Sequence, residues 1–185
     1  MTGGQLKKLF FIVALACCIM PLTHGSPPTL SAFSAKWTPL QIIVLPFALF
    51  NEATPVYGLN LTTFGGFHSE VYGISCGLVQ NSAIHVGVGV GIGNATFNNY
   101  GLMLGGLNAS IRNPGVAVGI ANVCTTDPAV WIPTSDNFLQ IGLFNYAQNG
   151  LQIGVLNYNP NALIPWMVLF NYSPRPDEET EKPGE

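Results

Sequence analysis

The sequence predicts an all-β protein built from short tandem repeats. Three observations carry this prediction: an eight-residue unit that occurs twice almost unchanged, glycines inside the copies of that unit, and an apolar alternation with a period of two residues. The two clearest copies are residues 139–146 and 151–158. Repeat chains bury their cores by stacking neighbouring units, and they usually work as surfaces or scaffolds.

Related copies extend through most of the chain at a spacing of about 12 to 15 residues, which suits one strand and a turn per unit. Their pattern is glycine, apolar, any residue, apolar, glycine, apolar, any residue, asparagine. The further copies are residues 40–44, 58–64, 73–80, 87–94, 101–108, 115–122 and 166–172. Gln80 takes the asparagine place, and Gly106 takes an apolar place. The first and last copies are modified, as the ends of a repeat array require.

The alternation within one unit favours a strand over a helix. Leu139, Ile141 and Leu143 share one face of a strand, because side chains of a strand point alternately to opposite sides. A helix fits poorly, since each interior glycine costs a helix about 1 kcal/mol relative to alanine. Asn149-Gly150, between the two clearest copies, is a strong hairpin-turn signal.

Two arrangements of these strands fit the pattern. We expect an antiparallel meander or barrel-like sheet, and the alternative is a parallel β-solenoid. A straight strand of eight residues rises roughly 26 Å, whereas the four residues left in the shortest copies reach at most roughly 14 Å. A solenoid turn would therefore have to bend inside the motif, which a hairpin does not require. The regular asparagine favours the solenoid.

The chain divides into four parts. Residues 1–25 are predicted to be a secretory signal peptide, with Lys7 and Lys8 before an apolar run and small residues before Ser26. A membrane anchor and a lipid-modified Cys17 or Cys18 remain alternatives. Residues 26–39 are expected to be a linker, and 40–173 the β-repeat domain with a loop insertion at 125–138. Residues 174–185 form an acidic tail that should be disordered.

Charge is sparse within the repeats. Between residues 37 and 173 the charged residues are Glu52, Glu70, Arg112, Asp127 and Asp136, whereas ordinary globular domains carry about 25% charged residues. Three explanations compete: a membrane-embedded barrel, assembly with further copies, or a surface wetted by Asn, Ser, Thr, Gln and backbone groups. The sequence has no basic patch, so nucleic acid is not an expected partner.

Five residues are candidates for a site. Cys76 and Cys124 are the cysteines beyond residue 25, and an exported protein can join two such residues in a disulfide. Two buried free thiols are the alternative. The long loop carries Asp127, Trp131 and Asp136, and a polar loop held by a rigid scaffold is a common place for function, although it is often only a solvated loop.

The sequence indicates no catalytic constellation, cofactor or metal. Glu70 lies two residues after His68, so both side chains would face one side of a strand. No third ligand is recognisable near them or near His85, and a metal site needs at least three protein ligands. The glycines at 87–93 lie inside the repeat and lack the strand–turn–helix context of a dinucleotide fingerprint.

With the motif written out, the chain resembles a family of largely uncharacterised bacterial surface-repeat proteins with tandem Gly-Leu-Gln-Ile-Gly-Leu-x-Asn units. The matching segments are Val-Tyr-Gly at 56–58 and 71–73, both Leu-Gln-Ile-Gly copies, and the proline-containing final unit from 164 to 171. The resemblance covers roughly residues 40–172. It implies a cell-envelope protein of a bacterium with an outer membrane and no particular activity.

Together these observations predict an exported, non-enzymatic repeat protein with a structural or adhesive role at the cell envelope, in the outer membrane or periplasm. Its partners there are not identified by the sequence; membrane association and self-assembly are both compatible with it. The alternative function is a small outer-membrane β-barrel or pore, suggested by the sparse charge. An enzyme or small-molecule binder centred on the long loop is a third hypothesis.

Overall fold

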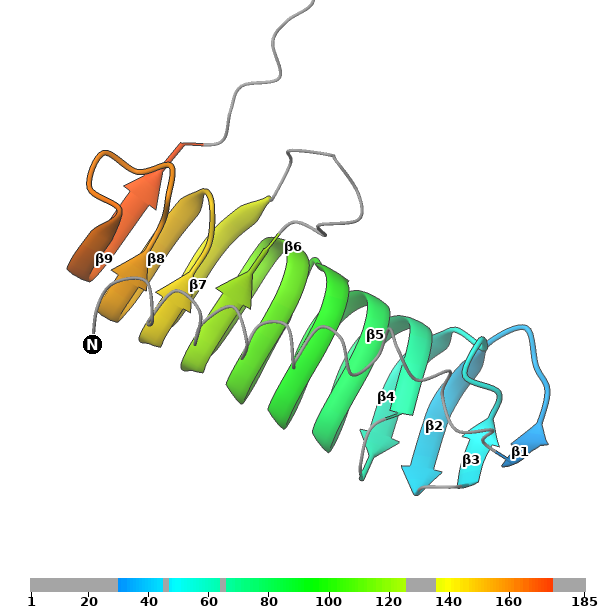
Figure 1. The fold of residues 1–185 in the computed structure, drawn as a ribbon. Coiled ribbons are helices and arrows are strands. Elements are labelled where there is room, and N and C mark those ends of the chain that lie inside the picture. Colours follow the sequence, from blue (N-terminus) through cyan, green and yellow to red (C-terminus); the bar gives the residue numbers. More distant parts are fainter. Residues whose placement is uncertain (1–29, 45–46, 64–65, 126–135, 175–185) are drawn as a thin grey trace, which may run out of the picture.

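The protein winds into an elongated solenoid, whose successive turns are stacked through parallel β-strand pairing (Figure 1). The computed structural model describes residues 30–44, 47–63, 66–125 and 136–174, and their regular elements are all strands. The strands are β1 (Leu30–Phe33), β2 (Thr38–Val44), β3 (Phe47–Phe50), β4 (Val56–Thr62), β5 (Gly66–Asn99), β6 (Leu102–Cys124), β7 (Asn137–Tyr146), β8 (Gly150–Tyr158) and β9 (Trp166–Ser173). In this described part, no helix is long and apolar enough to cross a membrane.

Parallel pairing runs through the body of the stack, and antiparallel strands lie at its ends. The sheet order is β1-β3-β2-β4-β5-β6-β7-β8-β9. The neighbours from β2 through β4 to β8 pair in parallel, whereas β3 pairs with β2, and β9 with β8, in antiparallel. The modified first copy, in β2, thus lies next to the reversed strand β3, and the modified last copy is itself the reversed strand β9.

The all-β repeat prediction is confirmed, and its parallel-solenoid alternative describes the architecture. The antiparallel meander or barrel-like sheet that the sequence favoured is not what the chain forms. Equivalent residues of successive units lie side by side, with Leu139 opposite Leu151 and Asn145 opposite Asn157. Each unit is therefore one turn of the solenoid, in register with the next.

The meander was favoured because a solenoid turn would have to bend inside the motif, and the structure contains that bend. Leu143 and Phe144 are adjacent, yet both are exposed, at 49% and 39%. Two neighbouring outward side chains mark a corner, since a straight strand would turn one of them inward. Leu78 and Val79 repeat this arrangement. The return path is also extended, so β5 runs through 34 residues and more than two turns.

The predicted hairpin at Asn149-Gly150 is likewise a corner of the solenoid. Gly150 has a φ of +82°, a value that L side chains rarely adopt, and the chain turns there into β8. β8 then pairs in parallel with β7, so no hairpin forms. Asn149 is buried, and its Oδ1 accepts a hydrogen bond from the backbone N–H of Asn137 at 2.8 Å.

The sheet begins earlier than the sequence predicted. β1 and the first residues of β2 fall within residues 26–39, which we expected to be a linker. At the other end, β9 ends at Ser173, the last residue of the predicted repeat domain. The predicted signal peptide, residues 126–135 of the loop insertion and residues 175–185 of the acidic tail lie outside the described residues.

Candidate functional site

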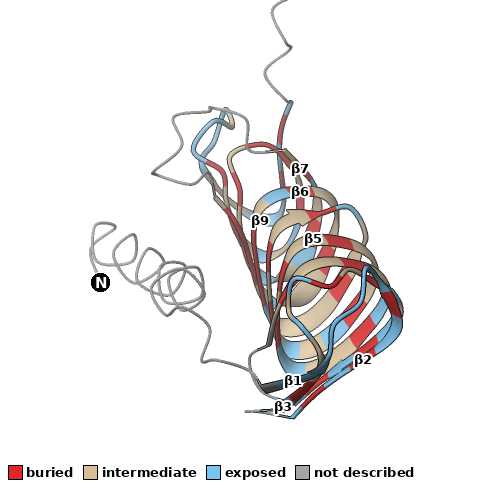
Figure 2. Cartoon of the chain, turned by 90° about the vertical axis from the view of Figure 1, so that its right-hand side faces the viewer, coloured by how far each residue is buried: buried red, intermediate tan, exposed pale blue. Residues whose placement is uncertain are grey.

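The interior of the solenoid is lined mainly by amide and hydroxyl side chains. Buried residues recur at the same place in successive turns and form bands along the solenoid (Figure 2). Among the described residues, 26 polar and 10 apolar residues are buried, so polar groups dominate the core. The most completely buried side chains with an amide group are Gln41, Asn60, Asn99, Asn113, Asn122, Asn137, Gln140, Asn145, Gln152, Asn157, Asn159 and Asn171.

The repeat asparagines form one continuous column. Nδ2 of each donates to Oδ1 of the asparagine in the next turn, at 2.8 Å in every pair, along the series Asn94, Asn108, Asn122, Asn145 and Asn157. The same nitrogen donates to a backbone carbonyl of the next turn; Asn122, for example, donates to Ile141 at 2.9 Å. Ile141 precedes the bend and Asn145 follows it, so this column ties the two sides of each corner together.

A second amide column lies on what we call the return side, the part of each turn between the end of one motif copy and the start of the next. Asn99 Nδ2 donates to Asn113 Oδ1 at 2.6 Å, and Asn113 Nδ2 donates to Asn137 Oδ1 at 2.9 Å. Asn137 Nδ2 then donates to the carbonyl of Asn149 at 3.0 Å. The sequence predicted a turn at Asn149, and this residue belongs to the same buried set. The side chains of the column supply the hydrogen bonds that buried polar groups require.

The asparagine column explains the glycines of the motif. A Cβ at Gly142 would lie 2.3 Å from the carbonyl oxygen of Gly119 and 2.6 Å from Nδ2 of Asn122. Gly119 and Gly154 meet equivalent obstacles in their own turns. The Cβ would point inward, where no side chain fits between the asparagine column and the neighbouring turn, so the motif needs glycine at this position.

The apolar side chains of the motif lie outside. We call the outward face of residues 40–44, 59–61, 74–79, 88–93, 102–107, 116–121, 139–144 and 151–156 the front wall. Ile92, Ile120, Leu143, Ile153 and Val155 on this wall are 64%, 57%, 49%, 41% and 57% exposed. A surface wetted by Asn, Ser, Thr, Gln and backbone groups does not describe this wall, because its outward side chains are aliphatic and the column amides are buried.

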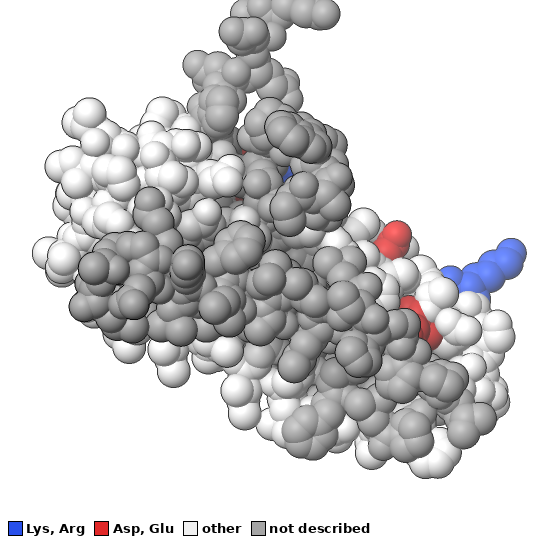
Figure 3. Space-filling model, viewed as in Figure 1, with Lys and Arg blue, Asp and Glu red and all other residues white. Residues whose placement is uncertain are grey.

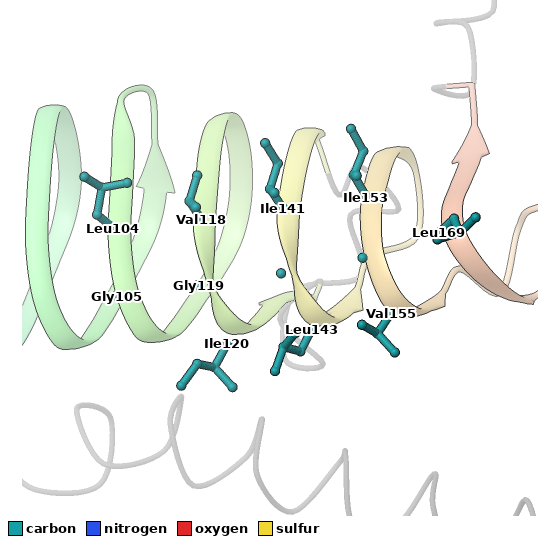
Figure 4. A pocket seen from close by; sticks show the side chains of 12 residues that line it. Leu104, Gly105, Val118, Gly119, Ile120, Ile141, Leu143, Ile153, Val155 and Leu169 are labelled. Atoms are coloured by element: carbon teal, nitrogen blue, oxygen red, sulfur yellow. The ribbon is translucent and has the colours of Figure 1, made fainter.

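A groove runs along the C-terminal half of the front wall. Its glycine floor separates two aliphatic ridges (Figure 4). The first ridge is Leu104, Val118, Ile141 and Ile153; the second is Ile120, Leu143 and Val155; the floor is Gly105, Gly119, Gly142 and Gly154. The groove has a volume of about 700 Å³. Leu169 also lines it, with a φ of 74° that is strained for a leucine.

The charged residues of the described chain lie away from the front wall. They are Lys36, Glu52, Glu70, Arg112 and Asp136. Glu70 and Arg112 each precede the first glycine of a unit by three residues, and Asp136 is paired with Arg112, so these three lie on the return side of the turns. On the face shown in Figure 3, most of the coloured charged atoms lie toward the β1–β4 end.

The two candidate cysteines are far apart along the stack. No disulfide joins them, and Cys124 is fully buried. Cys76 lies three turns before Cys124, which at about 4.8 Å per turn separates them by roughly 14 Å. A disulfide requires Cα atoms within about 7 Å. Cys124 follows Thr96 and Ser110 at the same inward position, and its thiol donates to the carbonyl of Ile111 at 3.5 Å.

Of the candidate loop residues, the structure describes Asp136. Its Oδ2 accepts a hydrogen bond from Arg112 Nη2 at 2.6 Å, and its backbone carbonyl accepts the N–H of Asn113. The side-chain hydrogen bond between Arg112 and Asp136 is the main cause of the raised pKa of Arg112. Asp136 thus attaches the re-entering chain to the preceding turn. Asp127 and Trp131 lie outside the described residues.

The histidines are inside the solenoid. Burial lowers the pKa of His68 to about 4 and also lowers the pKa of His85. Both ring nitrogens of His68 and Nε2 of His85 are buried without a hydrogen-bond partner among the described residues. His68 and Glu70 do not share a face, as the sequence predicted they would, because Glu70 lies outside and contacts Tyr72. No group of three metal-ligating residues occurs in the described ranges.

The front wall is the feature that sequence reasoning missed. The signal was present in the clearest copies, where alternation places Gln140 and Gly142 on one face and Ile141 and Leu143 on the other. Asn145 returns to the inside beyond the corner at Leu143 and Phe144. Comparison with known proteins does not assign the surface: no family model, no curated protein and no solved structure matches this chain.

Proposed function

We propose that the chain is an exported, non-enzymatic structural protein of the bacterial cell envelope that acts through its front wall. The observation that carries this proposal is the inverted polarity of the solenoid: hydrogen-bonded amides lie inside, and aliphatic side chains lie outside. Large exposed apolar surfaces mark sites of contact with proteins or membranes. The predicted signal peptide and the family resemblance favour the envelope as the place of that contact.

The return side of the turns carries charged residues, unlike the front wall, and is suited to face water. Glu70, Arg112 and Asp136 lie there, and the insertion leaves the array after Cys124 and re-enters it at Asp136 on the same side. The front wall carries no charge among the described residues. A protein with one apolar wall and one polar side is suited to lie against an apolar partner and to face water with the remainder.

The filled interior of the turns argues against the pore alternative. A pore needs an open lumen, whereas the two amide columns and the column of Gln140 and Gln152 fill the interior of the turns. Asn113, Asn122 and Gln152 are each 0% exposed. The side chains that would line a channel are instead hydrogen-bonded to one another.

Cell fractionation tests the proposal. We expect the full chain to be recovered with the envelope and to be digested by protease added to cells whose outer membrane has been permeabilised. A variant that lacks residues 2–25 is the matched control, because it keeps the solenoid and should remain in the cytoplasm. Recovery of both proteins in the cytoplasm would overturn the proposal.

A further inference from the structure

We infer that the front wall binds the front wall of a second copy of this chain, face to face. The groove of each copy receives the ridge formed by Ile120, Leu143 and Val155 of the other. This inference rests on the proposed function and names the partner of the same surface. The resulting interface is two-fold symmetric, because each copy contributes the same patch.

Matching periods favour a second copy over other apolar partners. Equivalent residues of neighbouring turns are separated by the spacing of paired strands, about 4.8 Å. The side chains of a ridge and the glycines of the groove therefore repeat at one interval along the axis. A second copy has the same interval, so several ridge residues can enter the groove together. A fluid lipid surface has no such period.

The groove has the shape that such packing needs. Its floor is the backbone of Gly105, Gly119, Gly142 and Gly154, whose side-chain direction is inward, toward the asparagine column. The aliphatic side chains of the two ridges project on either side of this floor (Figure 4). Stacked strands with identical side chains form dry, interdigitated interfaces in this way.

The available area is sufficient for a stable pair. Eight turns lie between β2 and β8, counted along the first glycine of each unit and the residues that replace it. At about 4.8 Å per turn and about five residue spacings of width, the front wall measures roughly 38 Å by 17 Å, or about 650 Å² per copy. Two copies would bury about 1,300 Å², within the range of specific protein interfaces.

Charge and chain connections leave the wall free to pair. Each of the five described charged residues lies off the front wall, so a two-fold pair brings no like charges together. Arg112 is already paired with Asp136. Thr125 and Asp136, the described residues on either side of 126–135, both pair with backbone of the return side. The described chain has no free basic rim on this wall for acidic lipid headgroups.

The first test measures the mass of the full chain by light scattering after size exclusion, without any substitution. We expect twice the mass of one chain at micromolar concentrations, falling to one chain on dilution. A single-chain mass at all concentrations would overturn the inference. So would a single-chain protein that floats with phosphatidylcholine vesicles, because the partner of the wall would then be lipid.

Charged ridges test the location of the interface. One variant carries lysine at Ile120, Leu143 and Val155, and a second carries glutamate at the same positions. We expect each alone to be a monomer and an equimolar mixture at low salt to recover the dimer, because opposite ridges then face each other. Leu163→Lys is the control, since Leu163 is 99% exposed and lies off the wall.

Two results would contradict this assignment: dimers of the lysine variant as stable as the wild type, or an equal loss of dimer in Leu163→Lys. Failure here is separable from failure of the proposed function. A monomer that still fractionates with the envelope would remove the second copy as partner and leave the envelope role standing. A dimer recovered in the cytoplasm would contradict the envelope role and leave the pairing of two front walls standing.

Discussion

The interior columns and the front wall belong to the same strands but have opposite chemistry. Inside, Asn122 is fully buried and joined by hydrogen bonds to Asn108 and Asn145. Outside, Ile120 and Leu143 are about half exposed. In most proteins the apolar face of a strand is buried and the polar face is solvated. This solenoid places the two faces the other way round.

The difference shows that hydrogen-bond saturation can replace apolar burial as the basis of a repeat core. A buried amide is costly without partners and is stabilising when its donors and acceptor are all used. Each column asparagine finds an identical partner one turn away, so the array satisfies them in series. The aliphatic side chains are then left for intermolecular contact.

The largest expected effect comes from an apolar substitution inside. Asn122→Leu removes two hydrogen bonds that Asn122 donates, to Ile141 O and Asn145 Oδ1, and one that it accepts from Asn108. Three buried hydrogen bonds are then lost; Asn145 Oδ1 loses its donor, whereas Asn108 Nδ2 keeps its bond to Val118 O. We therefore expect the free energy of unfolding to fall by about 3 kcal/mol. Urea denaturation followed by circular dichroism measures it.

The reciprocal substitution on the front wall is the control. Leu143→Asn places the same amide where it is about half exposed and solvated. We expect it to change the free energy of unfolding of the monomer by no more than about 0.5 kcal/mol. A larger loss of unfolding free energy for Leu143→Asn than for Asn122→Leu would show that the core is apolar and would contradict the inverted polarity.

The pH dependence of stability gives a second test of the interior, because His68 is buried there. The pKa of His68 is lowered to about 4 by burial, so the folded protein keeps this ring neutral while the unfolded chain protonates it near pH 6.5. The contribution of neutral His68 is therefore complete above pH 6.5 and is lost as pH falls toward 4. The shift corresponds to about 3 kcal/mol at most.

His68→Gln tests this expectation, because glutamine is polar and does not titrate in this range. We expect the variant to lose less stability than the wild type between pH 6.5 and pH 4, as measured by the urea midpoint. The remaining slope should include His85, whose pKa is lowered in the same direction. An unchanged pH profile in the variant would mean that His68 is not buried in neutral form.

The fold was predictable to the level of all-β tandem repeats, because the alternation and the glycines at 139–158 exclude a helix. The choice between a parallel solenoid and an antiparallel meander was not predictable, because it depended on whether the chain bends inside the motif. The bend is visible at Leu143 and Phe144 as two neighbouring outward side chains, and sequence alone does not show orientation. The asparagine that argued for stacking in fact bridges that bend.

The candidate sites were less predictable for a similar reason. Cys76 and Cys124 look equivalent in the sequence, but their separation depends on counting turns. Asp136 was chosen as a loop residue with a functional role, whereas its contact with Arg112 attaches the chain to the preceding turn. The front wall was not among the candidate sites, because alternation shows that the two faces of a strand differ but not which face is buried.

The smallest expected effect concerns the first residue of the asparagine column. Gln80 occupies the asparagine place, and its Nε2 donates to the carbonyl of Val90, as the column asparagines do to the equivalent carbonyl. The longer side chain does not reach the next amide, so Asn94 Oδ1 is buried without a partner among the described residues. The sequence spacing from Gln80 to Asn94 is 14 residues, the same as from Asn94 to Asn108.

Gln80→Asn should therefore extend the column by one turn. The new Nδ2 can donate to both Asn94 Oδ1 and Val90 O, whereas the weaker bond of Gln80 to Ser75 O at 3.3 Å is lost. We expect the free energy of unfolding to rise by about 1 kcal/mol or less. Gln80→Leu, of similar volume, is the control and should be destabilising. If both variants were destabilised equally, continuity of the amide column would not be what stabilises the interior.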